Sequence, residues 1–533
     1  MKKIFNIFMI TLAAISVSSC KKYLDVNTNT NQAISGTPDL VLPQSIVAVG
    51  GQTWAYNFYG SQVAGYLANG GGVSGWGAII SYNYASTDQQ GLFNNTYDIA
   101  NDIEYVIKNT EGKAEYVQYN AAAKVMKAYA FQRLVDQYND VPYTEALQGA
   151  SIIQAKYDKA TDIYKSLVNL CDAAITQFNA NPTATSQFKT ADPLFGSSST
   201  TTIEINRWIQ FANTLKLRMI IRAGDKVAFT NKNFDAKGFL TDDAIVNPGY
   251  AKISGKQNVY WNSFVYTFAG AAVAAGAQYV PTPYIVSYFD GTKLTDLGRA
   301  NLYYKNGTAI SSPSFTNQLG SQLATAGKGQ VPNSWFKGTS ATNYDQAGIF
   351  KGPDAGQPLF LAADSYFLQA EGMLNGLIVG DAKTAFNNGI TASFNYLDKN
   401  ASGAVAGNVP GSTVARAPVT EANAYRAANA GSYLVNFDLA TTPAQKLEAI
   451  ITQKYLALNM LFGDEAWNEY RRTGYPVNNV NGNATQTFTS IVTEATGPDR
   501  LPTRLSYPST EFNYNAGNIP SVDKYTSKIF WAK

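Results

Sequence analysis

Carboxylates are the residues of this chain whose type first suggests hydrolytic chemistry. The sequence of 533 residues contains no histidine, which excludes Ser-His-Asp and Cys-His systems, HExxH zinc sites and histidine-containing metal clusters. Hydrolysis by two carboxylates remains open, because it requires only an acid and a base or nucleophile about 5 to 10 Å apart and the chain has 38 acidic residues. We expect no cofactor, and the sequence does not indicate whether a metal ion is bound.

The densest group of charged residues follows an amphipathic stretch near the C-terminal end. Residues 443–462 carry apolar side chains at spacings of 4, 4, 3 and 4, which predicts a helix with one buried stripe. Five charged residues come directly afterwards: Asp464, Glu465, Glu469, Arg471 and Arg472. Paired surface charges are common, so we expect a solvated, salt-bridged helix end here and not a catalytic carboxylate pair.

Aromatic residues are the other group that could form a binding site. They make up 13% of the chain, including 34 Tyr and 7 Trp, and a flat ring can stack on the apolar face of a sugar. Several lie in stretches rich in Gly and polar residues, where a ring either contributes to a binding surface or packs inside the domain. We predict a stacking set that lies outside the periodic helices, with one amide as its hydrogen-bonding neighbour: Trp76, Tyr82, Trp261, Tyr266 and Trp335, with Asn333.

Long helices must position these residues. Helical periodicity is evident over residues 115–138, 161–178, 205–223, 363–374 and 382–397, and the last two should pack antiparallel because their connection is short. Loop-rich stretches separate the helices, chiefly residues 50–95, 181–203, 225–358 and 400–440. We therefore predict a mainly α fold of tetratricopeptide-like helix pairs with long, loop-rich ligand-binding insertions, although internal self-similarity is too weak to establish a repeat.

The amino terminus resembles a lipoprotein signal. A basic start at Lys2 and Lys3 precedes a short apolar run, and Ser18 and Ser19 precede Cys20. We predict that residues 1–19 are removed, that Cys20 carries the lipid, that residues 20–38 form a tether and that residues 39–533 form one domain. An ordinary signal peptide containing a cysteine is the alternative. No later stretch reaches 18 uninterrupted apolar residues.

The net charge and the cysteine content each exclude one possibility: the charge gives no reason to expect nucleic acid, and the cysteines allow no disulfide. Loss of Lys2 and Lys3 lowers the formal charge from +3 to +1, so nothing favours nucleic acid as a partner. Only Cys171 remains beside the lipidated cysteine, so no intramolecular disulfide can form. We interpret Cys171 as a small buried hydrophobe.

Five segments resemble the SusD/RagB family of Bacteroidetes outer-membrane nutrient-binding lipoproteins. They begin at Ala128 (AYAFQRLVDQYNDVPYTEAL), Arg207 (RWIQFANTLKLRMIIR), Asp364 (DSYFLQAEG), Pro443 (the stretch described above) and Arg504 (RLSYPSTEFNYNAGN). One departure is visible: Asp296, Leu297, Gly298 and Arg299 stand where an Asp-Pro-Arg triplet is expected, which puts the local loop geometry in doubt.

The resemblance implies a non-catalytic lipoprotein, anchored in the outer membrane and exposed at the cell surface. Such a protein would capture oligosaccharides and deliver them to a SusC-like TonB-dependent transporter. The same scaffold binding peptides or another nutrient is an alternative, and a carboxylate-based glycoside hydrolase is a further one. Because the fold does not determine the substrate, we infer the binding surface from the aromatic residues in the loops.

Overall fold

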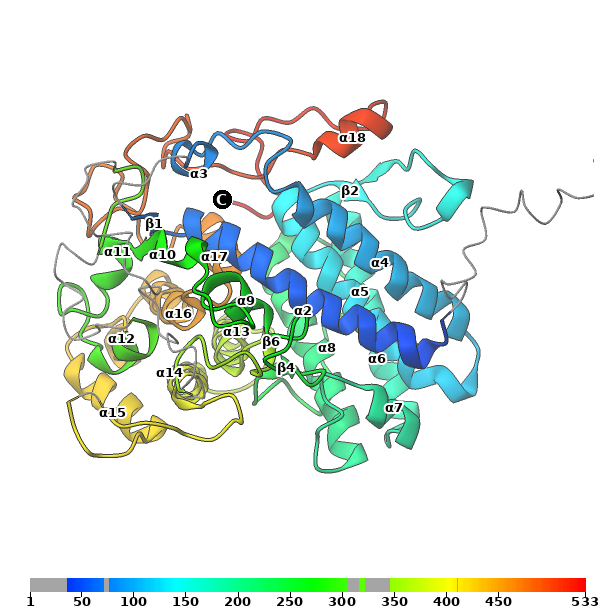
Figure 1. Ribbon diagram of the computed structural model, residues 1–533, viewed down its shortest axis with the longest axis horizontal. Helices are drawn as coiled ribbons and strands as arrows, with labels where there is room; N and C mark the ends of the chain where they lie inside the picture. The colour runs from blue at the N-terminus through cyan, green and yellow to red at the C-terminus, as the bar shows by residue number, and fades with distance from the viewer. Residues whose placement is uncertain (1–35, 71–75, 305–315, 322–345, 410) are drawn as a thin grey trace, which may run out of the picture.

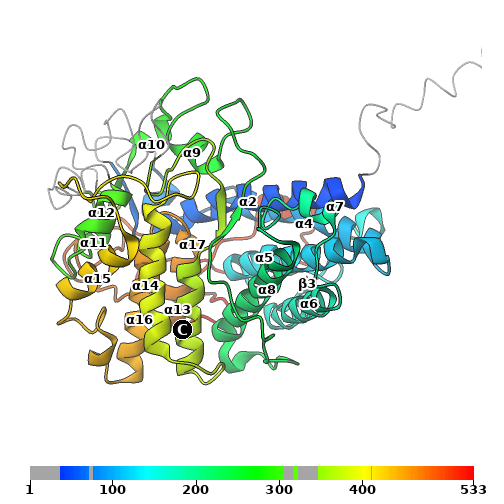
Figure 2. The same ribbon diagram turned by 90° about the horizontal axis from the view of Figure 1, so that it is seen from below.

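Long helices dominate the structure, a computed structural model that describes residues 36–70, 76–304, 316–321, 346–409 and 411–533. One group of helices comes from the first half of the chain: α2 (Pro38–Val63), α4 (Gln90–Thr110), α5 (Val117–Tyr138), α6 (Ala160–Ala180) and α8 (Thr201–Ala223). A second group comes from the second half: α13 (Ala362–Leu374), α14 (Ala382–Asp398), α15 (Pro418–Ala428), α16 (Pro443–Leu458) and α17 (Gly463–Thr473). The two groups lie side by side in Figures 1 and 2.

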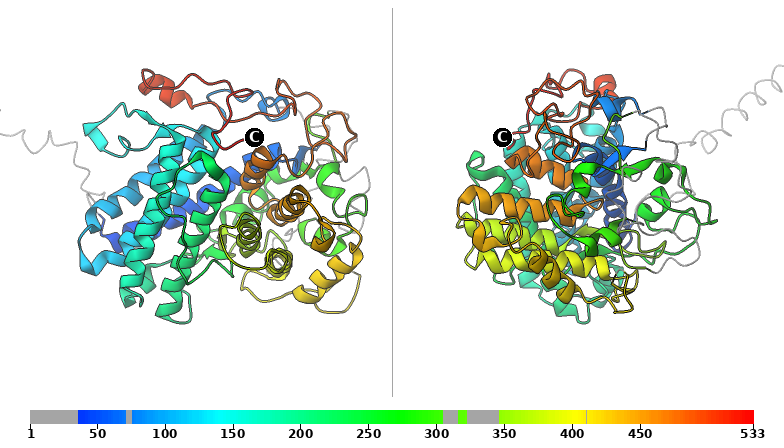
Figure 3. Two further views of the ribbon diagram at one scale, coloured as in Figure 1. Left: turned by 180° about the vertical axis from the view of Figure 1, so that it is seen from behind. Right: turned by 90° about the vertical axis from the view of Figure 1, so that its left-hand side faces the viewer.

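Neighbouring helices pack in a continuous series. Helix α2 packs on α4, α4 on α5, α5 on α6 and α6 on α8, and α8 then meets α13 of the second group. Helix α13 packs on α14 and α16, whereas α17 returns to α2. Figure 3 shows this arrangement from behind and from one side. The mainly α class and the α13–α14 pair are therefore confirmed.

Short elements occupy the connections. The helices among them are α3 (Ala78–Ser81), α7 (Ser186–Ala191), α9 (Val259–Phe264), α10 (Ala274–Ala277), α11 (Pro283–Val286), α12 (Leu297–Tyr303) and α18 (Ser509–Tyr514). Among the described residues, antiparallel strand pairs join separate segments: β1 (Leu67–Asn69) with β5 (Tyr279–Pro281), β2 (Val141–Pro142) with β3 (Tyr157–Asp158), and β4 (Ala244–Val246) with β6 (Gln357–Phe360). The first pair places Asn69 opposite Tyr279.

Two loop predictions are wrong. The stretch 50–95 contains the second half of α2 and the start of α4, and the stretch 400–440 contains α15. Helix α2 gives no amphipathic signal because its polar residues Ser45, Thr53 and Asn57 are buried along with its apolar ones. The predicted stripe over residues 443–462 is also interrupted, because the chain turns at Met460, whose φ is 58°.

Four of the five charged residues of α17 are buried and Arg472 is half-buried, which corrects the prediction of a solvated helix end. Asp464 accepts hydrogen bonds from Arg133 of α5, and Glu465 forms an ion pair of 2.6 Å with Arg222 of α8. Burial alone would raise the pKa of Glu465, but the guanidinium groups of Arg218 and Arg222 hold that pKa at about 2. Both Glu465 and its partners therefore remain charged inside the protein.

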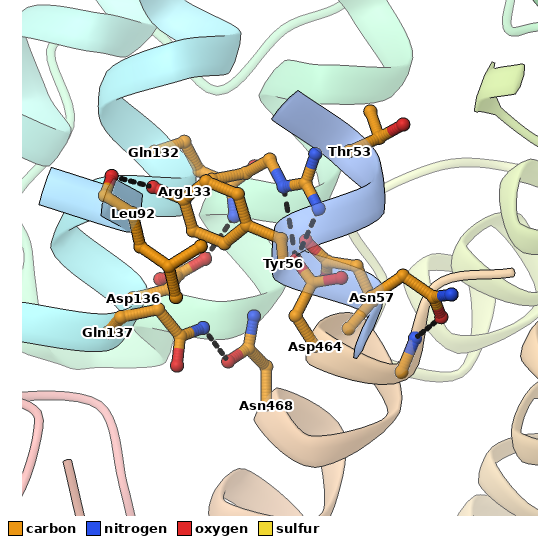
Figure 4. Close-up of polar contacts among 12 residues, drawn as sticks. Thr53, Tyr56, Asn57, Leu92, Gln132, Arg133, Asp136, Gln137, Asp464 and Asn468 are labelled. Atoms are coloured by element: carbon orange, nitrogen blue, oxygen red, sulfur yellow. Dashed lines mark hydrogen bonds and ion pairs between the residues drawn. The ribbon is translucent and has the colours of Figure 1, made fainter. Parts of the chain in front are cut away.

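Further ion pairs extend this network to the second half of the chain. Lys454 of α16 lies 2.7 Å from Asp364 of α13 and 3.1 Å from Glu469 of α17. Arg472 of α17 forms a bidentate contact with Glu371 of α13. Figure 4 shows the part around Arg133, whose guanidinium also lies 4.3 Å from the centre of the Tyr56 ring. Charged residues from four helices, α5, α8, α13 and α16, thus converge on α17.

Helices α2 and α17 meet backbone to backbone. A Cβ atom added at Gly60 would lie 1.9 Å from the amide nitrogen of Asp464, and one added at Gly463 would lie 2.3 Å from the nitrogen of Ser61. Asn57 reinforces the contact, since its side chain accepts a hydrogen bond from the Gly463 N–H and donates one to the Met460 carbonyl. Only glycine allows this approach.

Replacement of Gly60 by alanine should destabilise the protein. Alanine favours a helix over glycine by about 1 kcal/mol, but the added methyl group collides with backbone atoms, and overpacking costs about 1 to 3 kcal/mol or more. Gly51→Ala, in the same helix, is the matched control because nothing lies within 4 Å of its added Cβ. Denaturant unfolding should show a loss for Gly60→Ala and none for Gly51→Ala. Equal stability of the two variants would contradict the backbone contact.

Candidate ligand-binding face

A cluster of aromatic rings joins α2, α9 and β5 and reaches the surface at α2. Trp54 and Phe58 are four residues apart on α2, so they share one side of the helix. Their rings stack with centroids 5.3 Å apart and an interplanar angle of 22°. Both are half-buried, and Trp54 is the one tryptophan in the described part of the chain that is not fully buried. This pair forms the outer layer of the cluster.

Residues from α9 and β5 form the inner layer. Tyr260 and Phe264, again four residues apart, pack against Trp54 with centroid distances of 5.0 and 5.6 Å. Tyr279 packs edge-on against Phe58 at 5.0 Å. Burial raises the pKa of both Tyr260 and Tyr279, so their hydroxyl groups stay neutral. The inner rings fix the orientation of the outer pair.

The helix surface beside Trp54 is open. Gly51 lies one turn before Trp54, and a Cβ added there would meet nothing within 4 Å. Ala55, next to Trp54, is half-buried and small. This surface, formed by Gly51, Trp54, Ala55 and Phe58, can stack against the flat apolar side of a ligand, and we call it the α2 face.

The structure does not expose the stacking residues that the sequence suggested. Trp76, Trp261 and Tyr266 have exposed fractions of 5%, 2% and 8%. Trp261 lies in α9 and not in a loop, with its ring 6.0 Å from that of Tyr266. Trp76 joins the cluster, since its ring packs edge-on against Tyr279 at 4.6 Å. As arranged here, these three rings present little surface of their own.

Tyr82 lies apart from this face. It is fully buried, and its hydroxyl accepts a hydrogen bond from the Ser490 N–H. Its backbone carbonyl accepts another from the Tyr525 hydroxyl. These contacts are those of a packed residue, and the assignment of Tyr82 to a stacking set stays a prediction. Asn333 and Trp335 lie outside the described residues.

Sequence reasoning missed Phe58, Phe264 and Tyr279. The spacing of four in both Trp54–Phe58 and Tyr260–Phe264 was the available signal, because it places two rings on one side of a helix. The signal was overlooked because the glycines at positions 50 and 51 suggested a loop there and not a helix. The contact with Tyr279 depends on the pairing of β1 with β5, which short-range patterns do not predict.

The unusual segment from Asp296 to Arg299 has a structural role. Asp296 caps α12 by accepting a hydrogen bond from the Arg299 N–H, and its other oxygen pairs with the Arg299 side chain at 2.5 Å. The Arg299 guanidinium lies between the rings of Phe394 and Tyr425. Within the described ranges, no cluster of three or more acidic or cysteine side chains could hold a metal ion.

The family follows from comparison with known proteins. A family described as "Starch-binding associating with outer membrane" matches residues 49–508. The chain belongs to this SusD-like family. No curated protein matches it. In the described part of the chain, no helix is both long and apolar enough to cross a membrane.

Solved structures of other proteins, two of them SusD homologs, share the fold. A SusD homolog from Bacteroides uniformis has 21% sequence identity and a TM-score of 0.66, with 93% of this chain and 99% of that chain covered. A homolog from Parabacteroides distasonis has 19% identity and a TM-score of 0.66, covering 93% and 98%. A chitin-binding protein has 21% identity and a TM-score of 0.61, covering 93% and 100%. At these identities the likeness concerns the fold.

Proposed function

We propose that this SusD-like protein is a non-catalytic surface lipoprotein that captures oligosaccharides on the α2 face. The half-buried, stacked pair of Trp54 and Phe58 carries the proposal, because it offers a flat apolar surface whose orientation is already fixed by Tyr260 and Phe264. A binding surface that is ordered before the ligand arrives loses less entropy on binding. The starch-binding description of the family and the chitin-binding relative support an oligosaccharide over a peptide.

Trp54→Ala should weaken oligosaccharide binding roughly three- to tenfold, since one aromatic stacking contact contributes about 0.5 to 1.5 kcal/mol. The free energy of unfolding should fall by no more than about 2 kcal/mol, less than for a buried tryptophan. Titration calorimetry with malto- and chito-oligosaccharides, with the sugar recovered afterwards to check that it is uncleaved, measures both the binding and the absence of catalysis.

Two control variants sharpen this test. Trp54→Phe keeps a flat ring and should retain most of the binding. Phe512→Ala removes a ring that is 50% exposed on α18, away from the α2 face, and should change nothing. Binding that is insensitive to Trp54→Ala, or binding of short peptides in place of oligosaccharides, would overturn the assignment.

We also propose that Cys20 anchors the protein in the outer membrane. The basic start, the short apolar run and Ser18-Ser19-Cys20 support lipid attachment at this position, and two or three acyl chains hold a folded domain stably at a membrane. Cys20→Ala should therefore release the protein from the membrane fraction, as measured by fractionation and immunoblotting. Unchanged partitioning would contradict the anchor.

The partner that we propose is a TonB-dependent β-barrel transporter. A receptor held beside the barrel raises the local concentration of ligand at its mouth. The protein purified from detergent-solubilised membranes should bring the transporter with it, and mass spectrometry identifies the co-purified barrel. Repeated recovery of this protein alone, under conditions that preserve other membrane complexes, would argue against the partnership.

A further inference from the structure

The connection between β2 and β3 presents apolar side chains to solvent beside α18 (Figure 1). We call residues 146–155 the β2–β3 tip. Ile153 in this tip keeps 80% of its surface exposed, and Tyr514 at the end of α18 keeps 71%. Neither the tip nor residues 513–522 contain a charged side chain. An exposed apolar surface of this kind indicates contact with a partner protein or a membrane.

Hydrogen bonds hold the two uncharged segments together. The side chain of Gln154 donates to the carbonyl of Tyr514 at 3.2 Å, and the side chain of Asn515 donates to the carbonyl of Ala155 at 2.9 Å. Asn518 donates in turn to the carbonyl of Gln154. The apolar side chains of the tip therefore project from an ordered backbone, which lowers the entropy lost when they make a contact.

The β2–β3 tip lies at the end of α4 where the predicted tether joins the domain. The carbonyl of Gly36, the first described residue, accepts a hydrogen bond of 2.9 Å from the Tyr105 hydroxyl of α4. Lys108, one turn later on α4, donates to the carbonyl of Leu147 in the tip at 3.0 Å. Even when fully extended, the chain from Cys20 to Gly36 reaches at most about 55 Å. A lipid on Cys20 would therefore keep this end of the domain near the membrane.

A bilayer surface matches both the composition and the position of the tip. Isoleucine side chains favour hydrocarbon, and a tyrosine ring favours the boundary between hydrocarbon and water. Because the tip contains no charged side chain, its insertion does not require a charge to be desolvated. Lys159, which is exposed directly after β3, can pair with a lipid phosphate.

We propose that the β2–β3 tip and Tyr514 contact the membrane surface, so that the end of the domain where the tether joins faces the bilayer. The inference rests on the lipid anchor proposed at Cys20. Ile152, Ile153 and Tyr514 provide only weak, reversible binding, since even a single acyl chain binds a membrane reversibly. The contact therefore orients the domain and does not replace the anchor, and Cys20→Ala is still released from the membrane fraction.

A fluorophore on a single introduced thiol tests this contact. Lipid attachment consumes the thiol of Cys20, and Cys171 is fully buried, which raises the pKa of its thiol. A thiol-reactive fluorophore therefore labels Ala150→Cys, at an exposed position of the tip. The lipidated full chain is reconstituted in vesicles of phosphatidylethanolamine and phosphatidylglycerol that contain a nitroxide-labelled phospholipid. Quenching by the nitroxide should lower the fluorescence at least roughly twofold, because the label would lie at the depth of the headgroups.

Val379 provides the matched controls. It is fully exposed in the connection between α13 and α14, in the second group of helices. A fluorophore on Val379→Cys should not be quenched. Ile153→Asp should abolish most of the quenching at position 150, because a carboxylate opposes insertion of the tip. Val379→Asp places the same charge on another exposed aliphatic position and should leave that quenching unchanged.

Flotation of the vesicles separates this inference from the proposed anchor. Protein that does not float with the vesicles contradicts both the anchor at Cys20 and the membrane contact. Protein that floats but shows no quenching at position 150, or equal quenching at positions 150 and 379, overturns the membrane contact alone. Protection of position 150 only after a β-barrel transporter is added to the vesicles would assign the tip to a protein partner, which also overturns the membrane contact.

Discussion

Neutralisation of the charges on α17 inside the protein is the constraint on which the rest of the structure depends. Asp464, Glu465 and Glu469 are all buried, and each requires a cation from another helix. Removing one member of a buried pair costs about 3 to 5 kcal/mol, because the remaining charge stays desolvated. The positions of α5, α8 and α16 relative to α17 are therefore specified by charge as well as by apolar packing. Helix arrangements that bury only some members of this network are disfavoured, because the remaining buried charges would lack partners.

The helices show which elements the sequence predicts and which it does not. Helices α5, α6, α8, α13 and α14 have apolar residues at helical spacing, and their positions were predicted. Helix α2 was not recognised because both its polar and its apolar residues are buried, so it has no face that contrasts with another. The charges of α17 suggested solvent for a related reason: the partners that neutralise Glu465 lie on α8, more than 240 residues earlier. Local spacing carries no information about such distant pairing.

The α2 face consists of other residues than the stacking set that the sequence suggested. The excess of aromatic residues was visible, but exposure cannot be read from residue type. Trp261 was assigned to a loop and lies in α9, and Tyr82 is a core residue despite its polar sequence neighbours. Trp54, in contrast, keeps an open side because Gly51 and Ala55 leave room beside it. Small residues next to a large ring are a more specific signal of an exposed platform than the ring alone.

The contact between α2 and α17 has a consequence for how the protein reaches its folded state. The hydrogen bond from Gly463 to Asn57 spans 406 residues, so α2 has no partner on that side until the chain has been synthesised as far as α17. Contacts of such long range are slow to form, and apolar surface that waits for its partner is prone to aggregation. A protein built in this way benefits from a chaperone that shields α2 until α17 arrives.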